Sequence, residues 1–377
     1  MTSTQTKTLI IGAGPGGLAV AGRLAKLGEP FEVIEMASEV GAAWVAHYDR
    51  LHLHTAKDLS ALPHMAFPQD YPLYVPKSQL VSYMRNYAAH FGICPHFGEQ
   101  AVSVKNVGSK WLTTTALGTV FESDNVVVGT GFNRVPVVPK WPGMDLFEGA
   151  LQHSRDYKNG AAFAGKRVLV VGMGNTGAEL ALDLHEHGAV PFISARGPVN
   201  VVLRDFLGKP TQYTAVRLQR YPTWVSDMVS TVLQKIMVGD LSKYGLQRPR
   251  MAPSKQLREL GKTPVIDLGT VDLIKKGAVG ILPGIKAFNA HSVVFTDGHE
   301  RDFDAVVLAT GYQSKVAEFV DDMSQVLNHL GEPKAPVIPE RSGLYFIGFG
   351  AYAGGILRSI HMNSKQIVEH LLERQTH

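Results

Sequence analysis

Two glycine-rich turns, 160 residues apart, limit the possible folds of this 377-residue chain more than any other sequence feature. In the first, the apolar run Thr8–Ile11 is followed by GAGPGG (12–17) and then by the helix-like stretch 18–27. In this G-x-G-x-x-G pattern the first glycine permits a tight turn and the second lets a pyrophosphate approach the backbone. The third allows the helix and the strand to pack closely. Strand, glycine turn and helix in this order predict a βαβ unit that binds a dinucleotide.

An acidic residue completes the first pattern. Glu35 ends the strand-like run FEVIE, 23 residues after Gly12, where a carboxylate can accept hydrogen bonds from ribose hydroxyls. The helix N-terminus offers free N–H groups and a partial positive charge to phosphates. Glycines also mark ordinary turns, so the prediction depends on the strand, the helix and the acid together. The expected cofactor contacts here are Gly12, Gly14, Pro15, Gly16, Gly17 and Glu35.

The second turn repeats the plan with one difference. GMGNTG (172–177) follows the apolar run VLVV, and the next strand-like run ends with Arg196, 24 residues after Gly172. A carboxylate at that position would repel a 2′-phosphate, whereas a guanidinium binds it, so the pattern favours NADPH over NADH. The alternative is that Arg196 is only a solvated strand-end residue. The expected contacts are Gly172, Gly174, Asn175, Thr176, Gly177, Ser194 and Arg196.

Two dinucleotide sites in one chain imply one tightly held cofactor and one that exchanges, most simply FAD at the first turn and NADPH at the second. The segments 124–131 and 304–311 form another matched pair, since each is an apolar run ending in Thr-Gly. We therefore expect an α/β fold with two three-layer, Rossmann-like dinucleotide-binding domains. The expected FAD domain, residues 1–160 and 285–377, is interrupted by an NADPH domain at 161–284.

Composition excludes several other classes of protein. Hydrophobic residues make up 45% and charged residues 19%, which is typical of a globular protein with a sizeable core. The net charge of +4 is small for this length and argues against nucleic-acid binding. No stretch reaches the ~18 uninterrupted apolar residues of a membrane span, and no secretory segment is evident. We expect a cytoplasmic protein with a small-molecule substrate; whether it forms a homodimer is left open.

The segment between the two turns carries a more specific pattern. Phe147-x-Gly149-x-x-x-His153-x-x-x-Tyr157 resembles the signature of class B flavin-dependent monooxygenases. Tyrosine at the last position is similar to the N-oxygenating and general flavin-containing branch, whereas the Baeyer–Villiger branch usually has tryptophan followed by proline. With both glycine turns and LATGY (308–312), the resemblance covers essentially the whole chain. It implies that this segment is a hinge and packing element between domains.

Four further segments resemble the plant YUCCA flavin monooxygenases, at 50–63, 71–91, 239–249 and 261–269. This resemblance implies oxidative decarboxylation of indole-3-pyruvate to indole-3-acetate as one candidate activity. The alternative within the family is N- or S-oxygenation of soft nucleophiles, and the sequence leaves this choice open. In either case the resemblance implies hydride transfer from NADPH to FAD, followed by reaction with O2 to a flavin C4a-(hydro)peroxide.

The resemblance also indicates individual residues. His54 stands where many flavin-containing monooxygenases have an asparagine, so we expect it to tune the oxygenating species; the alternative is a histidine that only hydrogen-bonds in the core. The helix after GFGAYAGG (348–355) is expected to point its N-terminus toward the flavin. The remaining expected cofactor contacts are Trp44, His52, Val102, Thr130, Gly131, Thr310 and Gly311.

Two rival classes and one unassigned helix complete the analysis. A pyridine nucleotide–disulfide reductase also joins two such domains, but it needs a redox pair of cysteines and Cys94 is the only one here. A nucleotide-sensing regulator without catalysis would not need the motif at 147–157. Residues 224–238 show apolar side chains at i, i+4 spacing, for which core or subunit packing is the default expectation. A lid, a dimer face or a membrane-surface helix are the alternatives.

Overall fold

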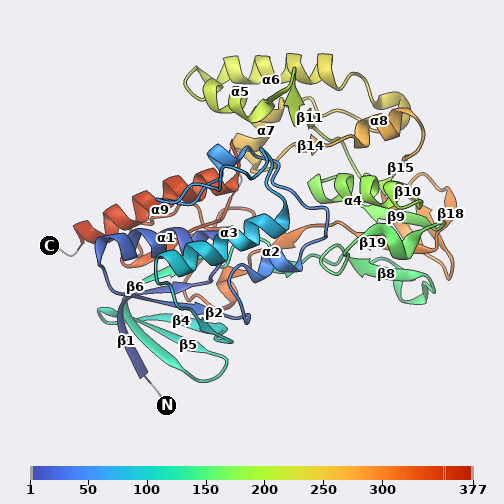
Figure 1. Cartoon of the computed structure of the whole chain (residues 1–377). Coiled ribbons are helices and arrows are strands. Elements are labelled where there is room, and N and C mark those ends of the chain that lie inside the picture. Colours follow the sequence, from blue (N-terminus) through green and yellow to red (C-terminus); the bar gives the residue numbers. More distant parts are fainter. Residues whose placement is uncertain (1–2, 351, 353, 375–377) are drawn as a thin grey trace.

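The computed structural model describes residues 3–350, 352 and 354–374, and it contains two α/β units side by side (Figure 1). The expected fold of two Rossmann-like domains is confirmed. The first unit is built on a seven-stranded sheet, in which β21 (Leu344–Phe346) also pairs with β6. The other strands lie in the order β3 (His96–Phe97), β2 (Phe31–Glu35), β1 (Ser3–Ile11), β6 (Val120–Val128), β5 (Lys110–Thr115) and β4 (Ala101–Val107).

Alternating side chains of the first sheet contribute to two different cores. Ile10 belongs to the cluster formed with helices α1 (Pro15–Leu27), α3 (Lys77–His90) and α9 (Ile356–Glu373). Its neighbours Leu9 and Ile11 belong to a second cluster with the β4–β5 side of the sheet. This alternation follows from the two-residue period of a strand and gives the expected layers. Because β1 pairs in parallel with both β2 and β6, their carboxyl ends meet at one edge of the sheet.

The second unit has a five-stranded parallel sheet. Helices α4 (Asn175–Glu186) and α8 (Thr270–Lys275) cover one face, and an antiparallel sheet of β16 (Ile285–Phe288), β17 (Ser292–Phe295) and β18 (Glu300–Asp302) covers the other. The parallel strands lie in the order β15 (Gly280–Leu282), β10 (Val190–Ser194), β9 (Arg167–Val171), β19 (Ala305–Leu308) and β8 (Ala150–His153).

Strand pairing moves both domain boundaries from the expected positions. Residues 150–160 and 285–308 were expected in the first domain. However, β8 and β19 pair with each other and β19 pairs with β9, so both belong to the second sheet. Backbone hydrogen bonding, which the spacing of the glycine turns does not reveal, decides this assignment. We propose that the second domain runs from about residue 150 to about residue 308.

The chain crosses between the domains twice, and the two crossings are paired. The outward crossing, residues 134–143, contains the short strand β7 (Val135–Pro136). β7 pairs antiparallel with β20 (Tyr312–Gln313) on the return crossing. The Thr310 hydroxyl donates to the Val137 carbonyl, and the Val137 N–H donates to Gly311. These contacts tie the two connections into one double-stranded hinge.

An extension of the second domain lies above the first in the view of Figure 1. It comprises β11 (Val201–Leu203), β12 (Asp205–Phe206), β13 (Lys209–Pro210), α5 (Thr211–Leu218), α6 (Thr223–Met237), α7 (Pro253–Leu260) and β14 (Val265–Asp267). On the apolar stripe of α6, Trp224, Met228, Val232 and Ile236 are exposed, so these four side chains do not pack in the core of the chain, and packing against a second subunit stays a prediction. Among the described residues, no helix is both long enough and apolar enough to cross a membrane.

Candidate functional site

A cavity of about 350 Å³ opens at the carboxyl end of β1. Gly12, Gly14, Glu35 and Thr130 line it, as expected. A Cβ placed on Gly14 would have no atom within 4 Å, so the space before the N-terminus of α1 is open. Thr130 Oγ1 is buried in the cavity wall, and no described residue forms a hydrogen bond with it. The open helix N-terminus fits the pyrophosphate of a dinucleotide.

The other residues of the first turn shape the protein. Pro15 is the first residue of α1, and a Cβ on Gly17 would lie 1.9 Å from the Gly12 carbonyl oxygen, so only glycine fits there. A Cβ on Gly16 would lie 3.2 Å from a methyl carbon of Ile347. Close packing of helix and strand therefore explains both glycines.

Two backbone N–H groups hold the Glu35 carboxylate in place. Oε2 accepts from Ala13 at 2.7 Å and Oε1 accepts from Ala37 at 2.9 Å. A carboxylate fixed in this way keeps lone pairs available for ribose hydroxyls at the end of β2. The geometry therefore fits the acid position of a dinucleotide site.

Several expected contacts lie away from this cavity. Trp44, on α2 (Ala42–Ala46), packs against the first core, while its neighbours Ala43 and Ala46 face the cavity. Val102 is exposed, and Ala101 before it lines the cavity, because successive residues of β4 point to opposite sides. Gly131 and the exposed His52 do not line it either.

The cavity also has lining residues that the sequence did not single out. His47 follows α2, and burial, followed by Lys77, Arg155 and Lys158, lowers its pKa to about 4. Arg155 lies inside the motif at 147–157, and its guanidinium lies 5.3 Å from the ring centroid of Tyr312, the last residue of LATGY. Two quoted motifs thus meet at this wall, which their separate positions in the sequence did not reveal. The polar lining residues missed are His47, Glu99, Gln100, Asn133, Arg134, Arg155 and Tyr312.

The second glycine turn repeats the geometry of the first. A Cβ on Gly174 would again meet nothing within 4 Å, whereas one on Gly177 would lie 1.9 Å from the Gly172 carbonyl oxygen. Arg196 is exposed, and none of the described residues forms a side-chain hydrogen bond or ion pair with it. An open helix N-terminus and a free guanidinium fit the diphosphate and 2′-phosphate of NADPH.

Two other residues expected at this turn have protein partners. The Ser194 hydroxyl donates to the Pro283 carbonyl at 2.7 Å, and Asn175 Oδ1 accepts from the Ile266 N–H at 2.7 Å. Both contacts fix local backbone. Thr176 lies close enough to Tyr48 for a hydrogen bond between their side chains.

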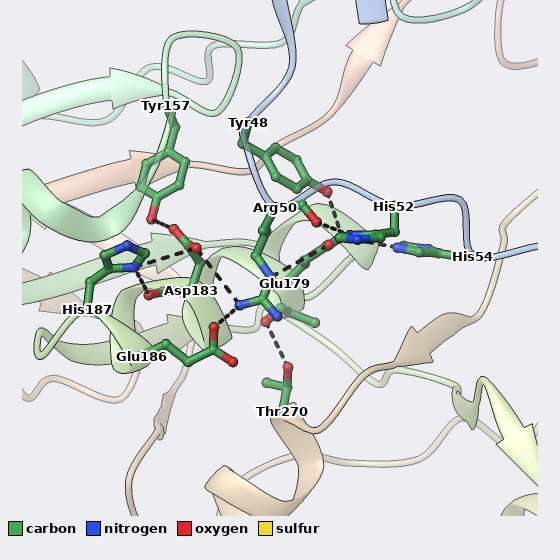
Figure 2. A network of polar contacts seen from close by, with 11 residues as sticks. Tyr48, Arg50, His52, His54, Tyr157, Glu179, Asp183, Glu186, His187 and Thr270 are labelled. Carbon is green, nitrogen blue, oxygen red and sulfur yellow. Dashed lines mark hydrogen bonds and ion pairs between the residues drawn. The ribbon is translucent and has the colours of Figure 1, made fainter. Parts of the chain in front are cut away.

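A polar network joins the segment 48–54 of the first domain to α4 of the second (Figure 2). Its centre is Glu179, a buried carboxylate on α4. His54 Nε2 lies 3.1 Å from Glu179 Oε2, and the Tyr48 hydroxyl donates to the same oxygen at 2.8 Å. Arg50 forms ion pairs with two carboxylates of α4: its Nε lies 3.8 Å from Glu179 Oε1, and its Nη1 lies 2.6 Å from Glu186 Oε2. His54 is therefore half-buried at the domain junction, outside the wall of the cavity.

The motif at 147–157 makes packing contacts. The Tyr157 hydroxyl donates to Asp183 Oδ2 of α4 at 2.6 Å (Figure 2). The Tyr157 ring stacks on Phe163. Phe147 packs edge-on against Phe288. His153 is buried edge-on against Tyr312. The motif thus connects the second domain to the hinge, and none of Phe147, His153 and Tyr157 lines the cavity.

Comparisons with known proteins agree with these features. The family described as FMO-like, flavin-binding monooxygenase-like, matches residues 7–373. Indole-3-pyruvate monooxygenase YUCCA1 of Oryza sativa subsp. japonica is 40% identical over 349 residues, which cover 90% of this chain and 86% of that protein. Probable indole-3-pyruvate monooxygenase YUCCA9 of Arabidopsis thaliana is 41% identical over 353 residues, covering 90% and 83%. The structure of cyclohexanone monooxygenase from Rhodococcus sp. Phi1 bound to NADP+ has the same fold, with a TM-score of 0.70 at 18% identity over 100% of this chain and 85% of that chain.

Proposed function

Because the chain belongs to the flavin-binding monooxygenase-like family and is an oxidoreductase that uses FAD and NADPH, we propose that its substrate is a 2-oxo acid such as indole-3-pyruvate. One observation carries this proposal: proteins named as indole-3-pyruvate monooxygenases are 40% and 41% identical to the chain over 90% of its length. Membership of an enzyme family also removes the regulator without catalysis from consideration.

The proposed reaction balances without a further co-reactant. NADPH supplies two electrons and becomes NADP+, one atom of O2 enters the substrate, and the other leaves as water with a proton from solvent. The bond between the keto carbon and the carboxylate of the 2-oxo acid breaks, and CO2 leaves. The former keto carbon becomes the carboxylate of an acid one carbon shorter. Bound flavin supplies the activated oxygen, while the chain binds and orients the reactants and excludes water.

We assign FAD to the cavity at β1. Gly14 leaves room for the pyrophosphate at the N-terminus of α1, Thr130 lines the same cavity, and Glu35 would receive the ribose. His47, Arg155 and Tyr312 lie in the remaining wall, where they would face the rest of the flavin nucleotide. With His47 neutral, Arg155 is the neighbouring cation that can pair with an anionic group of the cofactor or substrate, while over the whole wall Arg134 and Arg155 are balanced by Glu35 and Glu99.

We assign NADPH to the second turn. Gly174 leaves the space before α4 open, and Arg196 at the end of β10 is free to bind a 2′-phosphate. Helix α4, whose N-terminus would hold the diphosphate, also carries Glu179. The network at Glu179 therefore links the coenzyme domain to His54 on the flavin side.

We propose that His54 holds a hydrogen at Nε2 against Glu179 and presents Nδ1 as an acceptor. The Glu179 carboxylate is a hydrogen-bond acceptor, so it selects the imidazole tautomer with hydrogen on Nε2. Nδ1 of His54 has no partner among the described residues. This arrangement supports a role in setting the protonation of the oxygenating species, with Glu179 as the positioning residue.

A product analysis tests the proposed substrate. FAD-loaded protein is supplied with NADPH in air and, separately, with indole-3-pyruvate or a thioether. We expect the 2-oxo acid to yield CO2 and the shorter acid in amounts equal to the NADPH consumed. Sulfoxide formation without decarboxylation would instead support the S-oxygenating alternative. NADPH oxidation that gives only hydrogen peroxide with both compounds would contradict both substrate classes.

A further inference from the structure

Helix α6 carries an apolar stripe that faces solvent. Trp224, Met228, Val232 and Ile236 follow one another at four-residue steps, and each is between 47% and 73% exposed. Tyr221, one turn earlier, is 60% exposed. These positions fall on one side of a helix, so their exposed area is continuous. Isolated exposed apolar residues are common on proteins, but a continuous stripe of large side chains marks an interaction surface.

The opposite side of α6 is polar and faces the protein. Asp227 accepts from Arg258 at 2.9 Å and from Ser254 at 2.6 Å, both on α7. Gln234 is buried and donates to Asn200 Oδ1 at 3.0 Å. In Figure 1 the helix runs along the upper edge of the molecule, with α7 and β11 beneath it. These directional contacts fix the rotation of α6, so its apolar side faces outward in the folded chain.

Positive charge accompanies this stripe. Lys209, Arg217, Arg220 and Lys235 are exposed, and none of the described residues forms a side-chain hydrogen bond or ion pair with them. Three of the four acidic residues of the same stretch form ion pairs: Asp227 pairs with Arg258 and Glu259 pairs with Lys255. Asp205 pairs with Arg204 and accepts from Tyr74. Residues 204–262 contain eleven Lys and Arg but only four Asp and Glu, in a chain whose total net charge is +4.

This charge distribution distinguishes between occupants of the stripe. In a twofold dimer each face meets a copy of itself, so the unpaired cations of one subunit would approach those of the other. An apolar stripe flanked by free Lys and Arg instead matches a surface with an apolar interior and anionic head groups. We propose that α6 docks the protein on an anionic phospholipid bilayer, lying in the interface with its stripe among the acyl chains.

The geometry of the helix suits this position. Lys235 lies on the same side of α6 as Trp224 and Met228, and its long stem can reach up to the head groups while its neighbours enter the apolar layer. Tryptophan and tyrosine favour the boundary between head groups and hydrocarbon, which is where Trp224 and Tyr221 would lie. The cytoplasmic location expected from the sequence is the side on which membranes present anionic lipid.

Sedimentation with vesicles tests the proposal on the full, FAD-loaded chain. Vesicles of phosphatidylcholine alone are compared with vesicles that also contain phosphatidylserine, and the flavin absorbance of the pellet measures binding. We expect binding to the anionic vesicles that high salt weakens, with a blue shift of tryptophan emission. Absence of binding, or equal binding to both vesicle types, would overturn the proposal.

Matched variants separate the stripe from its charges. Met228→Glu is expected to abolish binding, while Leu117→Glu, at a site 71% exposed in the first domain, should leave it intact. Each cation near an anionic surface is worth about 1 kcal/mol, so Arg217→Gln with Arg220→Gln should lower the partition coefficient roughly thirtyfold. NADPH oxidation without vesicles reports that each variant is folded. If sedimentation equilibrium shows a dimer that Met228→Glu dissociates, the stripe is a subunit interface and the proposal fails.

Discussion

His54 Nε2 lies 3.1 Å from Glu179 Oε2, and this contact joins segment 48–54 of the first domain to helix α4, which follows the second glycine turn. Glu179 is buried, and its other partners, Tyr48 and Arg50, come from the same segment as His54. A buried carboxylate without these partners would be costly, so the network holds segment 48–54 and α4 together. The position of His54 therefore depends on contacts with the second domain.

Replacing His54 tests its proposed role in oxygenation. His54→Asn keeps a polar side chain but removes the imidazole that contacts Glu179, so we expect a changed ratio of thioether to 2-oxo acid turnover. Reduction of the flavin by NADPH, followed in the absence of O2, should change less. Glu179→Gln should alter the same product ratio, while Glu186→Gln, on the exposed side of the network, serves as the control. An unchanged product ratio in His54→Asn would assign His54 to packing.

The two open glycines allow a paired test of the cofactor assignment. Gly14 and Gly174 have similar extended backbones and free space beside them, so valine fits the fold at both positions but fills the space for the phosphates. We expect Gly14→Val to be purified without FAD. Gly174→Val should retain FAD and show a raised KM for NADPH. Stoichiometric FAD in a folded Gly14→Val protein would contradict the assignment of the first turn.

The glycine turns were predictable from the sequence because positions such as Gly17 and Gly177 have no room for a side chain. A Cβ on Gly17 or Gly177 would lie 1.9 Å from a carbonyl oxygen of its own turn, and such constraints leave a direct trace in the sequence. The domain boundaries were not predictable from spacing, since they depend on which strands pair. The matched runs ending in Thr-Gly contained the relevant signal: β6 lies beside β1, and β19 occupies the equivalent place beside β9.

The rest of the cavity wall depends on contacts between distant segments. His47, Arg155 and Tyr312 come from three parts of the chain that only the hinge brings together. Val102 points away from the cavity for a local reason. Successive residues of a strand face opposite sides of the sheet, so a shift of one residue along the strand changes which side a residue faces. The direction of the α6 stripe was also hidden, because amphipathic spacing does not show which side of a helix meets the protein.

The hydrogen bond from Tyr157 to Asp183 should stabilise the second domain. Burial and the nearby Asp183 raise the pKa of the Tyr157 hydroxyl, so it stays protonated and donates. Tyr157→Phe leaves the buried carboxylate without this donor, which should cost about 1–3 kcal/mol of unfolding free energy. Urea denaturation measures the change, with Tyr221→Phe at an exposed site as the control. Equal stability of the two variants would show that Arg50 and His187 alone satisfy Asp183.

His47 should make the stability of the flavin-free protein depend on pH. Burial, reinforced by Lys77, Arg155 and Lys158, lowers its folded pKa from 6.5 to about 4. Between these values the unfolded chain binds a proton that the folded chain does not, so stability falls as pH falls through this window. One such proton contributes a slope of up to about 1.4 kcal/mol per pH unit.

Urea midpoints across this window test the effect. His47→Gln should flatten the slope relative to the unsubstituted protein, and the same change at the exposed His90 controls for the loss of an imidazole. If His47→Gln keeps the full slope, other groups carry the pH dependence, and the neutral His47 proposed for the cavity wall loses its support.

Arg196 provides the test of coenzyme choice. A guanidinium grips a 2′-phosphate with two parallel hydrogen bonds, and one charge-assisted hydrogen bond is worth roughly 1.5–3 kcal/mol. A tenfold change in affinity corresponds to about 1.4 kcal/mol, so Arg196→Ala should weaken the binding of NADPH by roughly ten- to a few hundredfold. NADH lacks the 2′-phosphate, and its KM should hardly change. The measurement is steady-state oxidation of both coenzymes by the two proteins at matched ionic strength.

The outcomes of that measurement separate three roles for the strand end. Equal weakening of NADPH and NADH would mean that Arg196 supports the end of β10 without contacting the phosphate. If binding of neither coenzyme weakens, a residue of segment 198–204 would have to bind the 2′-phosphate. Ser194 is not suited to this role, because its hydroxyl already donates to the Pro283 carbonyl and has only acceptor lone pairs left, which a phosphate repels. We expect Arg196→Ala to weaken the binding of NADPH selectively, because the Arg196 guanidinium is exposed and no described residue pairs with it.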